Sequence, residues 1–326
     1  MFHACRCIAL CLALLSSFAH GQGLGAPYPA KPVTIVVPFP PGASPDIDGR
    51  QWGQRLAEAL GKPFVMDFKP GGGGIIGMNY VAKSSPDGHI LLIVSGSLTV
   101  QAATRADLPF DPLKDFTPLS LLLRRLVVLL VHPSLPVNNF SEYVAHVKAR
   151  PGELNTGTNG PGAITHIVGA WLNSSAGLNM TFVHYKGTAP MLQDLVAGRI
   201  HSTTGSISTS FPFVKSGKLR PIALLGRDKT DLMPGMKTVA EQGLPGFDYS
   251  TWTGLLGPAG MPSTVVDRLS TEIGRIAKTS EMTSMFAKDG TLAVGSSAAE
   301  FRKFLIAETT NMKRVAQEFN IKAVDD

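Results

Sequence analysis

Residues 33–46 read Val-Thr-Ile-Val-Val-Pro-Phe-Pro-Pro-Gly-Ala-Ser-Pro-Asp, and this stretch decides the fold class. The five β-branched residues at its start predict a buried strand. Prolines and Gly42 then predict a turn, and Trp52, Leu56 and Leu60 mark one face of a following helix. A strand, a turn and a helix in this order form the first half of a βαβ unit, which is typical of parallel α/β sheets.

The same alternation of Val- and Ile-rich runs with helical segments continues along the chain. Further strands are predicted at 64–68, 90–94, 180–185, 199–203, 219–225 and 249–256, with a short one leading into Asn155. Further helices are predicted just after Gly74 and at 142–149, 166–173, 190–196, 266–276 and 298–319. Residues 119–131 form a long, mostly apolar run interrupted by Arg124 and Arg125, and we expect them to form strands that cross between lobes.

The pattern therefore predicts an α/β fold with two lobes, each a mainly parallel sheet flanked by helices, with hinge strands between the lobes. A chain of 326 residues is long enough to divide in this way. We expect residues 22–130 to form the first part of lobe one and residues 131–254 to form lobe two. Residues 255–326 are then expected to fold back onto lobe one, and the protein is expected to be a monomer.

The N-terminus has the layout of a secretory signal peptide. Arg6 lies in a short leading segment, which is followed by an apolar run from Ile8 to Phe18 and by small residues up to Gly21. The run is shorter than the roughly 20 residues that span a bilayer. We therefore expect residues 1–21 to be removed, the rest to be exported to the periplasm, and no permanent membrane anchor.

Cysteine content and charge exclude several classes of function. The 3 cysteines, Cys5, Cys7 and Cys11, all lie in the predicted signal peptide, so no disulfide, cysteine-based zinc site or cysteine nucleophile is expected. Loss of Arg6 with that segment changes the 30 Lys and Arg to 29, which against 24 Asp and Glu leaves a net charge of +5. This excess is small and forms no basic run, so no nucleic-acid partner is expected.

Four loops rich in glycine or hydroxyl groups each follow a predicted strand. They lie at 41–44, 95–97, 158–162 and 187–189, two in each half of the chain. Ligands of open α/β sheets bind beyond the carboxyl ends of the strands. A helix N-terminus there offers backbone N–H groups to an anion, and glycine lets the anion approach closely. Any one loop is an ordinary turn, but four together favour a shared cleft for a carboxylate.

Motifs for cofactors and catalysis are incomplete. Gly72-Gly-Gly-Ile-Ile-Gly77 fits G-x-G-x-x-G, but the next predicted strand ends in Ser95 instead of an acidic residue, and no Lys-Ser or Lys-Thr completes a phosphate loop. No G-x-S-x-G nucleophile motif occurs, and the histidines are scattered without metal-ligand spacing. We therefore expect no cofactor, no metal and no enzymatic activity.

Two further residues allow both a functional and a structural interpretation. His166 lies in the first turn of a helix that opens at the loop 158–162, where it could donate to a bound oxygen or simply be a structural histidine. If the ligand keeps His166 protonated, affinity is expected to fall as pH rises above neutrality. Asp46 could contact the ligand or cap its own helix.

Seven separated motifs occur in order along the chain, namely Val36-Val-Pro-Phe-Pro-Pro-Gly42, Asp46, Pro70-Gly71 with Gly73-Gly74, Ser85-Pro-Asp-Gly88, Phe110-Asp-Pro-Leu-Lys-Asp-Phe116, Tyr185-Lys-Gly187 and Pro258-Ala-Gly260. Together they resemble the motifs of the tripartite tricarboxylate transporter receptors, also called Bug receptors. The resemblance extends from about Tyr28 to the C-terminus. It implies a type II-like periplasmic binding-protein fold, a small organic carboxylate as ligand and a cognate two-component membrane permease as partner.

The resemblance also implies that the loops after the first strand and around Tyr185 grip a carboxylate. With the loops above, the candidate ligand-binding residues are Phe39, Pro41, Gly42, Ala43, Ser44, Asp46, Ser95, Gly96, Thr158, Asn159, Gly160, Pro161, His166, Gly187, Thr188, Ala189, Gly205 and Ser206. There are two alternatives. The protein could present its ligand to a sensor system, or, less in keeping with the motifs, it could be an α/β enzyme that acts on an organic acid.

The chain departs from the family pattern at several positions. Ala43 replaces a usual glycine, Phe68-Lys69 a usual Asn-Arg, Ala170 a common glutamate, and His201 and Gly205 usual aspartates. Without those carboxylates, little is left to pair with an ammonium group, and burial of an unpaired ammonium is costly. Hydroxyls at Thr203, Thr204 and Ser206 could instead bind a second acid group. We therefore expect an amine-free dicarboxylate, with aromatic dicarboxylates among the candidates.

Overall fold

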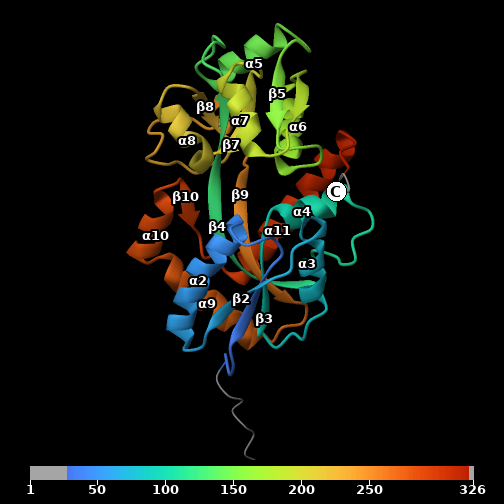
Figure 1. Cartoon of the computed structure of the whole chain (residues 1–326), viewed down its shortest axis with the longest axis vertical. Helices are drawn as coiled ribbons and strands as arrows, with labels where there is room; N and C mark the ends of the chain where they lie inside the picture. Colours follow the sequence, from blue (N-terminus) through green and yellow to red (C-terminus); the bar gives the residue numbers. More distant parts are fainter. Residues whose placement is uncertain (1–27, 323–326) are drawn as a thin grey trace, which may run out of the picture.

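The computed structural model describes residues 28–322, so the predicted signal peptide at 1–21 lies outside the described residues. Two lobes lie one above the other, and the chain passes between them several times (Figure 1). Within the described range, no helix is both long enough and apolar enough to cross a bilayer.

The first lobe is built around the strand order β2-β1-β3-β9-β4, with β10 on the far side of β4. Its strands are β1 (Val33–Val37), β2 (Phe64–Phe68), β3 (Ile90–Ser95), β9 (Ser250–Pro258), β10 (Thr291–Ala293) and the first part of β4 (Phe116–Val131). Its helices are α2 (Ser44–Leu60), the short 3-10 helix η2 (Gly72–Gly74), α3 (Ile75–Ala82), α4 (Ser97–Thr104), α9 (Ser263–Ala277) and α10 (Ser280–Ala287). Apolar side chains of β1, β3 and β4 are fully buried between these helices.

The second lobe is built around the last part of β4, which pairs with β7 on one side and β8 on the other. Its other strands are β5 (Asn155–Thr158), β6 (Thr181–His184), β7 (Ser202–Ser206) and β8 (Arg220–Leu224). Its helices are α5 (Phe140–Lys148), α6 (Ile164–Ala176), α7 (Thr188–Val196), α8 (Ile207–Lys215) and the 3-10 helix η3 (Ala240–Gln242).

Strand β4 joins the two lobes as one continuous element of 16 residues. Residues 116–126 pair with β9 in the first lobe, and residues 127–131 pair with β7 in the second. The switch therefore falls between Leu126 and Val127, both of which are buried. This agrees with the expectation that residues 119–131 cross between lobes.

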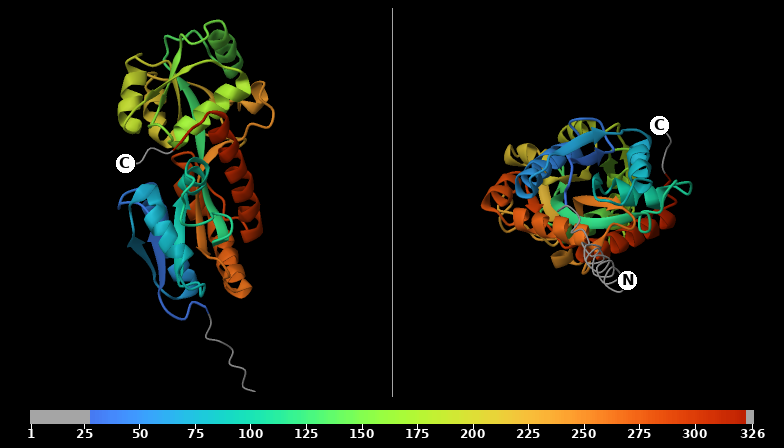
Figure 2. Two further views of the ribbon diagram at one scale, coloured as in Figure 1. Left: turned by 90° about the vertical axis from the view of Figure 1, so that its right-hand side faces the viewer. Right: turned by 90° about the horizontal axis from the view of Figure 1, so that it is seen from below.

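Helix α11 (Ala298–Glu318) packs against both lobes as well. Near its start, Phe301 and Leu305 belong to a core cluster of the first lobe. Near its end, Met312 and Val315 belong to the main core cluster of the second lobe. The helix runs alongside the connection between the lobes (Figure 2).

The predicted fold class is confirmed, but each sheet is mixed and not mainly parallel. The pairs β1 with β2, β1 with β3, β5 with β6 and β5 with β7 are parallel, whereas every pairing of β4 is antiparallel. The strand predicted at 199–203 lies at Ser202–Ser206, and α4, α8, α10 and β10 were not predicted. The limits of the lobes at 22–130, 131–254 and 255–326 stay a prediction.

Candidate functional site

A cavity of about 350 Å³ lies between the two lobes. Its first-lobe lining comes from the loop before α2, the first turn of α2, the end of β3, β4 and β9, namely Phe39, Ala43, Ser44, Pro45, Ser95, Arg125, Thr251, Trp252 and Thr253. Its second-lobe lining is Asn159, Ile164, Thr165, Thr188, Met191, Thr204, Gly205, Ser206, Ser208 and Thr209. A larger cavity of about 770 Å³ shares Phe39, Ser95 and Asn159 with it and adds Gly96, Gly160 and Pro161.

The start of α2 forms part of the first-lobe wall of the first cavity, because Ala43, Ser44 and Pro45 all line it. The loop before the helix is held by Asp46, whose Oδ2 accepts a hydrogen bond from the Gly42 N–H at 2.8 Å. Its Oδ1 accepts from Arg50 Nε at 2.6 Å, and the side chain is buried. Asp46 therefore fixes the helix N-terminus, whose partial positive charge favours an anion, without lining either cavity itself.

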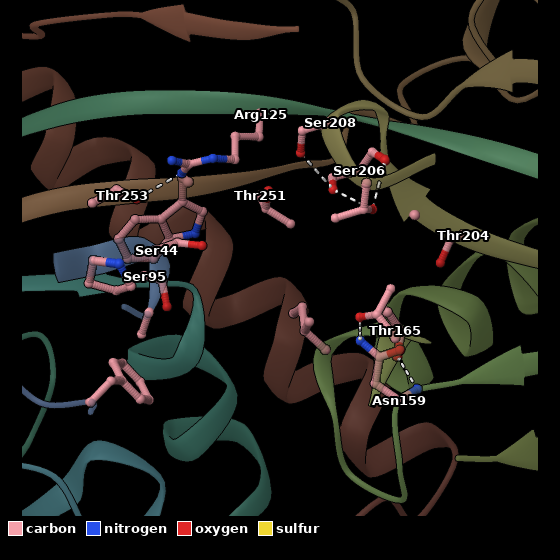
Figure 3. Close-up of a pocket in the computed structure, with 18 of the residues that line it drawn as sticks. Ser44, Ser95, Arg125, Asn159, Thr165, Thr204, Ser206, Ser208, Thr251 and Thr253 are labelled. Carbon is pink, nitrogen blue, oxygen red and sulfur yellow. Dashed lines mark hydrogen bonds between the residues drawn. The ribbon is translucent and has the colours of Figure 1, made fainter. Parts of the chain in front are cut away.

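Asn159 lies beside Thr165 on the second-lobe side of the cavity (Figure 3). Its N–H donates to Thr165 Oγ1 at 2.8 Å, and its Nδ2 donates to Thr188 Oγ1 at 3.1 Å. Its Oδ1 is buried and has no hydrogen-bond partner among residues 28–322. Asn159 therefore lines both cavities while one of its amide atoms has no partner in the described part of the chain.

A wall of hydroxyl groups forms the second-lobe side of the same cavity. Ser206 Oγ lies 3.1 Å from Ser208 Oγ and 3.0 Å from Thr209 Oγ1 (Figure 3). Beside them, Gly205 leaves space, since a Cβ there would meet only Leu130 Cδ1 within 4 Å, at 3.6 Å. These hydroxyls can rotate to donate to an acid group of a ligand.

Arg125, which the sequence reasoning did not select, also lines this cavity from β4. Its Nη1 donates to Thr253 Oγ1 at 3.1 Å, and its Nη2 donates to Asp48. Asp48 is fully buried, which raises the pKa of its carboxyl, while Arg125 lowers it. The available signal was the pair Arg124-Arg125 inside an otherwise apolar strand, although Arg124 turns to Asp228, Asp248 and Ser250 instead.

His166 is not among the residues that line either cavity. Its Nδ1 accepts from the Gly162 N–H at 3.2 Å, and its ring packs on that of His184 with centroids 4.7 Å apart. Burial, and secondarily His184, lower the pKa of His166 to about 4. The structural interpretation of this histidine is therefore favoured, and the conditional expectation that affinity falls above neutral pH loses its basis in this structure.

The remaining candidates divide by position. Those that line one or both cavities are Phe39, Ala43, Ser44, Ser95, Gly96, Asn159, Gly160, Pro161, Thr188, Gly205 and Ser206. Those that line neither are Pro41, Gly42, Asp46, Thr158, His166, Gly187 and Ala189. The latter group supports the loops: Thr158 Oγ1 is 2.6 Å from His184 Nδ1, and Gly187 caps α7 with a φ of 110°.

The departures from the family pattern in the second lobe do not all bear on the cavity. Gly205 lines it, but Ala170 is fully buried in the core of the lobe and His201 bonds to Asn155. Thr203 is likewise buried and donates to the Gly157 carbonyl. Within residues 28–322, no group of three or more His, Cys, Asp or Glu side chains could hold a metal ion.

Comparisons with known proteins agree on one family. Residues 49–321 match the family described as the tripartite tricarboxylate transporter family receptor. Protein BugT of Bordetella pertussis is 30% identical over 318 residues, which cover 95% of this chain and 98% of BugT. An R. palustris protein solved with adipate is 30% identical with a TM-score of 0.74, covering 91% of this chain and 100% of its own. MatC from Rhodopseudomonas palustris with bound malate is 29% identical with a TM-score of 0.70, covering 88% and 99%.

Proposed function

This chain belongs to the tripartite tricarboxylate transporter receptor family, and from that premise we propose that it captures an amine-free dicarboxylate between its lobes and delivers it to a two-component membrane permease. The family and the fold are those of substrate-binding receptors, not enzymes. We further propose that the chain is exported and acts in the periplasm, as the layout of residues 1–21 indicates.

The lining of the cavity is the observation that carries this proposal. It combines a helix N-terminus at Ser44, a set of hydroxyls around Ser206 and the cation of Arg125. The second cavity adds Arg105 and Lys186, and no acidic side chain is found among the residues that line either one. Such a lining favours a ligand with negative charge.

The absence of lining carboxylates also favours a ligand without an amine. An ammonium group buried here would meet the cation of Arg125 and no acidic partner in the lining. Taking an unpaired charge out of water costs roughly several kcal/mol. A few contacts between a small ligand and hydroxyl groups cannot offset this cost. Adipate and malate, found in the two related structures, are both dicarboxylates without an amine and fit this expectation.

A thermal-shift screen of the chain from residue 22 onward tests the proposal. The compounds are succinate, glutarate, adipate and benzene dicarboxylates, with acetate, butyrate, benzoate, citrate, aspartate and glutamate for comparison. Ligand at about 1,000 times its dissociation constant adds about 4 kcal/mol to the native state, which gives a clear rise in melting temperature. We expect at least one amine-free dicarboxylate to give the largest rise, and stronger stabilisation by aspartate or glutamate would contradict the proposal.

A further inference from the structure

Arg125 is unusually placed for an arginine, since it lies in the middle of the long apolar strand β4 and still reaches the cavity between the lobes. About 17% of its side chain is exposed. Among the residues that line the 350 Å³ cavity, it is the one with a charged side chain (Figure 3). A partly buried cation beside a cavity is a strong candidate for contact with an anionic ligand.

Two neighbours hold the guanidinium in a closed triangle of hydrogen bonds. Arg125 donates from Nη1 to Thr253 Oγ1 and from Nη2 to Asp48 Oδ1. Thr253 Oγ1 in turn donates to Asp48 Oδ2 at 2.7 Å. Because Thr253 lies on β9 and Asp48 on α2, three elements fix the position of one side chain. The guanidinium is therefore preorganised before any ligand arrives.

The triangle does not exhaust the hydrogen-bonding capacity of Arg125. A guanidinium has five N–H donors in a planar fork, and the triangle uses two of them. The fork matches the two oxygens of a carboxylate, which a lysine or a hydroxyl cannot match in the same way. The hydroxyl of Thr251 lines the cavity beside it and can add a further donor.

The second-lobe side of the cavity has a separate means of binding an acid group. Asn159 offers an amide there, and Ser206 and Ser208 offer hydroxyl groups, across the cavity from Arg125 (Figure 3). A ligand with one acid group needs only one of these two sides. A ligand with two acid groups can use both.

We propose that Arg125 binds the second acid group of a dianionic ligand and thereby sets the preference of this receptor for dicarboxylates over monocarboxylates. Asp48 and Thr253 act as positioning residues, which hold the guanidinium and do not contact the ligand. This inference rests on the proposed function, because it assumes that a carboxylate enters the cavity between the lobes.

Calorimetric titration with matched acids tests the proposal. The pairs are succinate with butyrate, adipate with hexanoate, and terephthalate with benzoate, each differing mainly in the second carboxylate. In Arg125→Gln, we expect the affinity for the dicarboxylate to fall about 10- to 100-fold, with the monocarboxylate changed less than about threefold. Arg125→Lys keeps the charge but not the fork, so it should show an intermediate loss.

Controls separate the binding role from a role in stability. Arg124→Gln alters the neighbouring arginine, which is not among the residues that line either cavity, and should leave the ratio of the two affinities unchanged. Because Arg125→Gln leaves Asp48 buried without its cation, the double variant Asp48→Asn with Arg125→Gln supplies a folded test if the single variant is unstable. Asp48→Asn alone should lower the dicarboxylate affinity by less than Arg125→Gln does and change the monocarboxylate affinity little, because the amide holds the guanidinium in place more weakly than the carboxylate.

The outcomes distinguish this inference from the function on which it rests. A wild-type protein that binds dicarboxylates, with an unchanged ratio in both the single and the double variant, would overturn the role of Arg125 and leave the proposed function standing. A wild-type protein that binds none of the six acids would overturn both. Loss of discrimination in the folded variants, with the ratio retained in Arg124→Gln, is the result we expect.

Discussion

Glu308 is a buried carboxyl at the point where α11 passes from one lobe to the other, and its replacement by glutamine should change how stability depends on pH. It lies between Leu305, in a first-lobe core cluster, and Met312, in the second-lobe core. Its Oε1 has no hydrogen-bond partner among the described residues. Burial raises the pKa of Glu308 to about 7, although the Trp252 side chain and Arg124 act in the opposite direction.

The size of the effect follows from the difference between the ordinary pKa of 4.5 and the value of about 7 in the folded chain. At about 1.4 kcal/mol per pH unit, this corresponds to roughly 3 kcal/mol. Below pH 4.5 the Glu308 carboxyl is protonated in both the folded and the unfolded chain, so its full contribution to the free energy of unfolding is present. Between pH 4.5 and about 7 only the unfolded chain releases the proton, so the free energy of unfolding falls as pH rises.

Urea denaturation followed by circular dichroism at several pH values between 4.5 and 8 measures this directly. The stability of Glu308→Gln minus that of the wild type should rise by roughly 3 kcal/mol across the range, because the amide does not ionise. Glu300→Gln, on the same helix, is a control, since hydrogen bonds from Ser297 lower the pKa of Glu300. Its pH-dependent effect on stability therefore lies below pH 4.5, so its difference from the wild type should stay nearly constant across the measured range. A difference for Glu308→Gln that stays constant with pH would refute the reasoning.

Three further predictions concern the cavity and the groups beside it. Gly205→Val should weaken binding of the preferred dicarboxylate about tenfold or more, because the added side chain occupies cavity space; unchanged affinity by calorimetry in a folded variant would remove Gly205 from the binding surface. Asp46→Ala should lower affinity and melting temperature together, because the Gly42 N–H loses its acceptor; an affinity loss with no change in melting temperature would indicate direct ligand contact. His166→Gln should leave affinity unchanged between pH 6 and pH 8, since the pKa of His166 is lowered to about 4; a pH dependence seen only in the wild type would show that this histidine takes part.

The sequence reasoning succeeded where local pattern determines structure. The β-branched run at 33–37 forms a strand that is almost wholly buried, and the glycine and proline turn after it leads into α2 as expected. The crossing of residues 119–131 between the lobes was also predictable, because the apolar run is longer than a strand within one lobe requires. The antiparallel pairing of β4 with β9 could not be predicted, because the chain passes through the second lobe between these two strands.

The elements that were missed carry weak local signals. Strand β10 has only 3 residues, and α8 contains Pro212, which is unfavourable inside a helix. Strand β7 was predicted three residues too early, because its sequence Ser-Thr-Thr-Gly-Ser carries hydroxyls in place of apolar residues and it is stabilised by pairing with β4 and β5. Tertiary contacts override local propensity in such segments.

The site was predictable in outline, because loops after strands gather at one edge of each sheet. Which side chain faces the cavity was not predictable, and Arg125 shows why. Its partners Asp48 and Thr253 are 77 and 128 positions away in the sequence, so the triangle that directs it exists only after folding. His166 gives the converse case, since its position in the helix was foreseen but its ring turns to Gly162 and His184.

The central claim is that this chain captures a dicarboxylate and leaves it unchanged. Calorimetric titration of the chain from residue 22 onward, with the dicarboxylate that stabilises it most, followed by chromatographic recovery of the bound compound, tests this claim directly. We expect one equivalent of ligand to bind and to be recovered intact. A converted product, or the absence of saturable binding by any dicarboxylate, would contradict the claim.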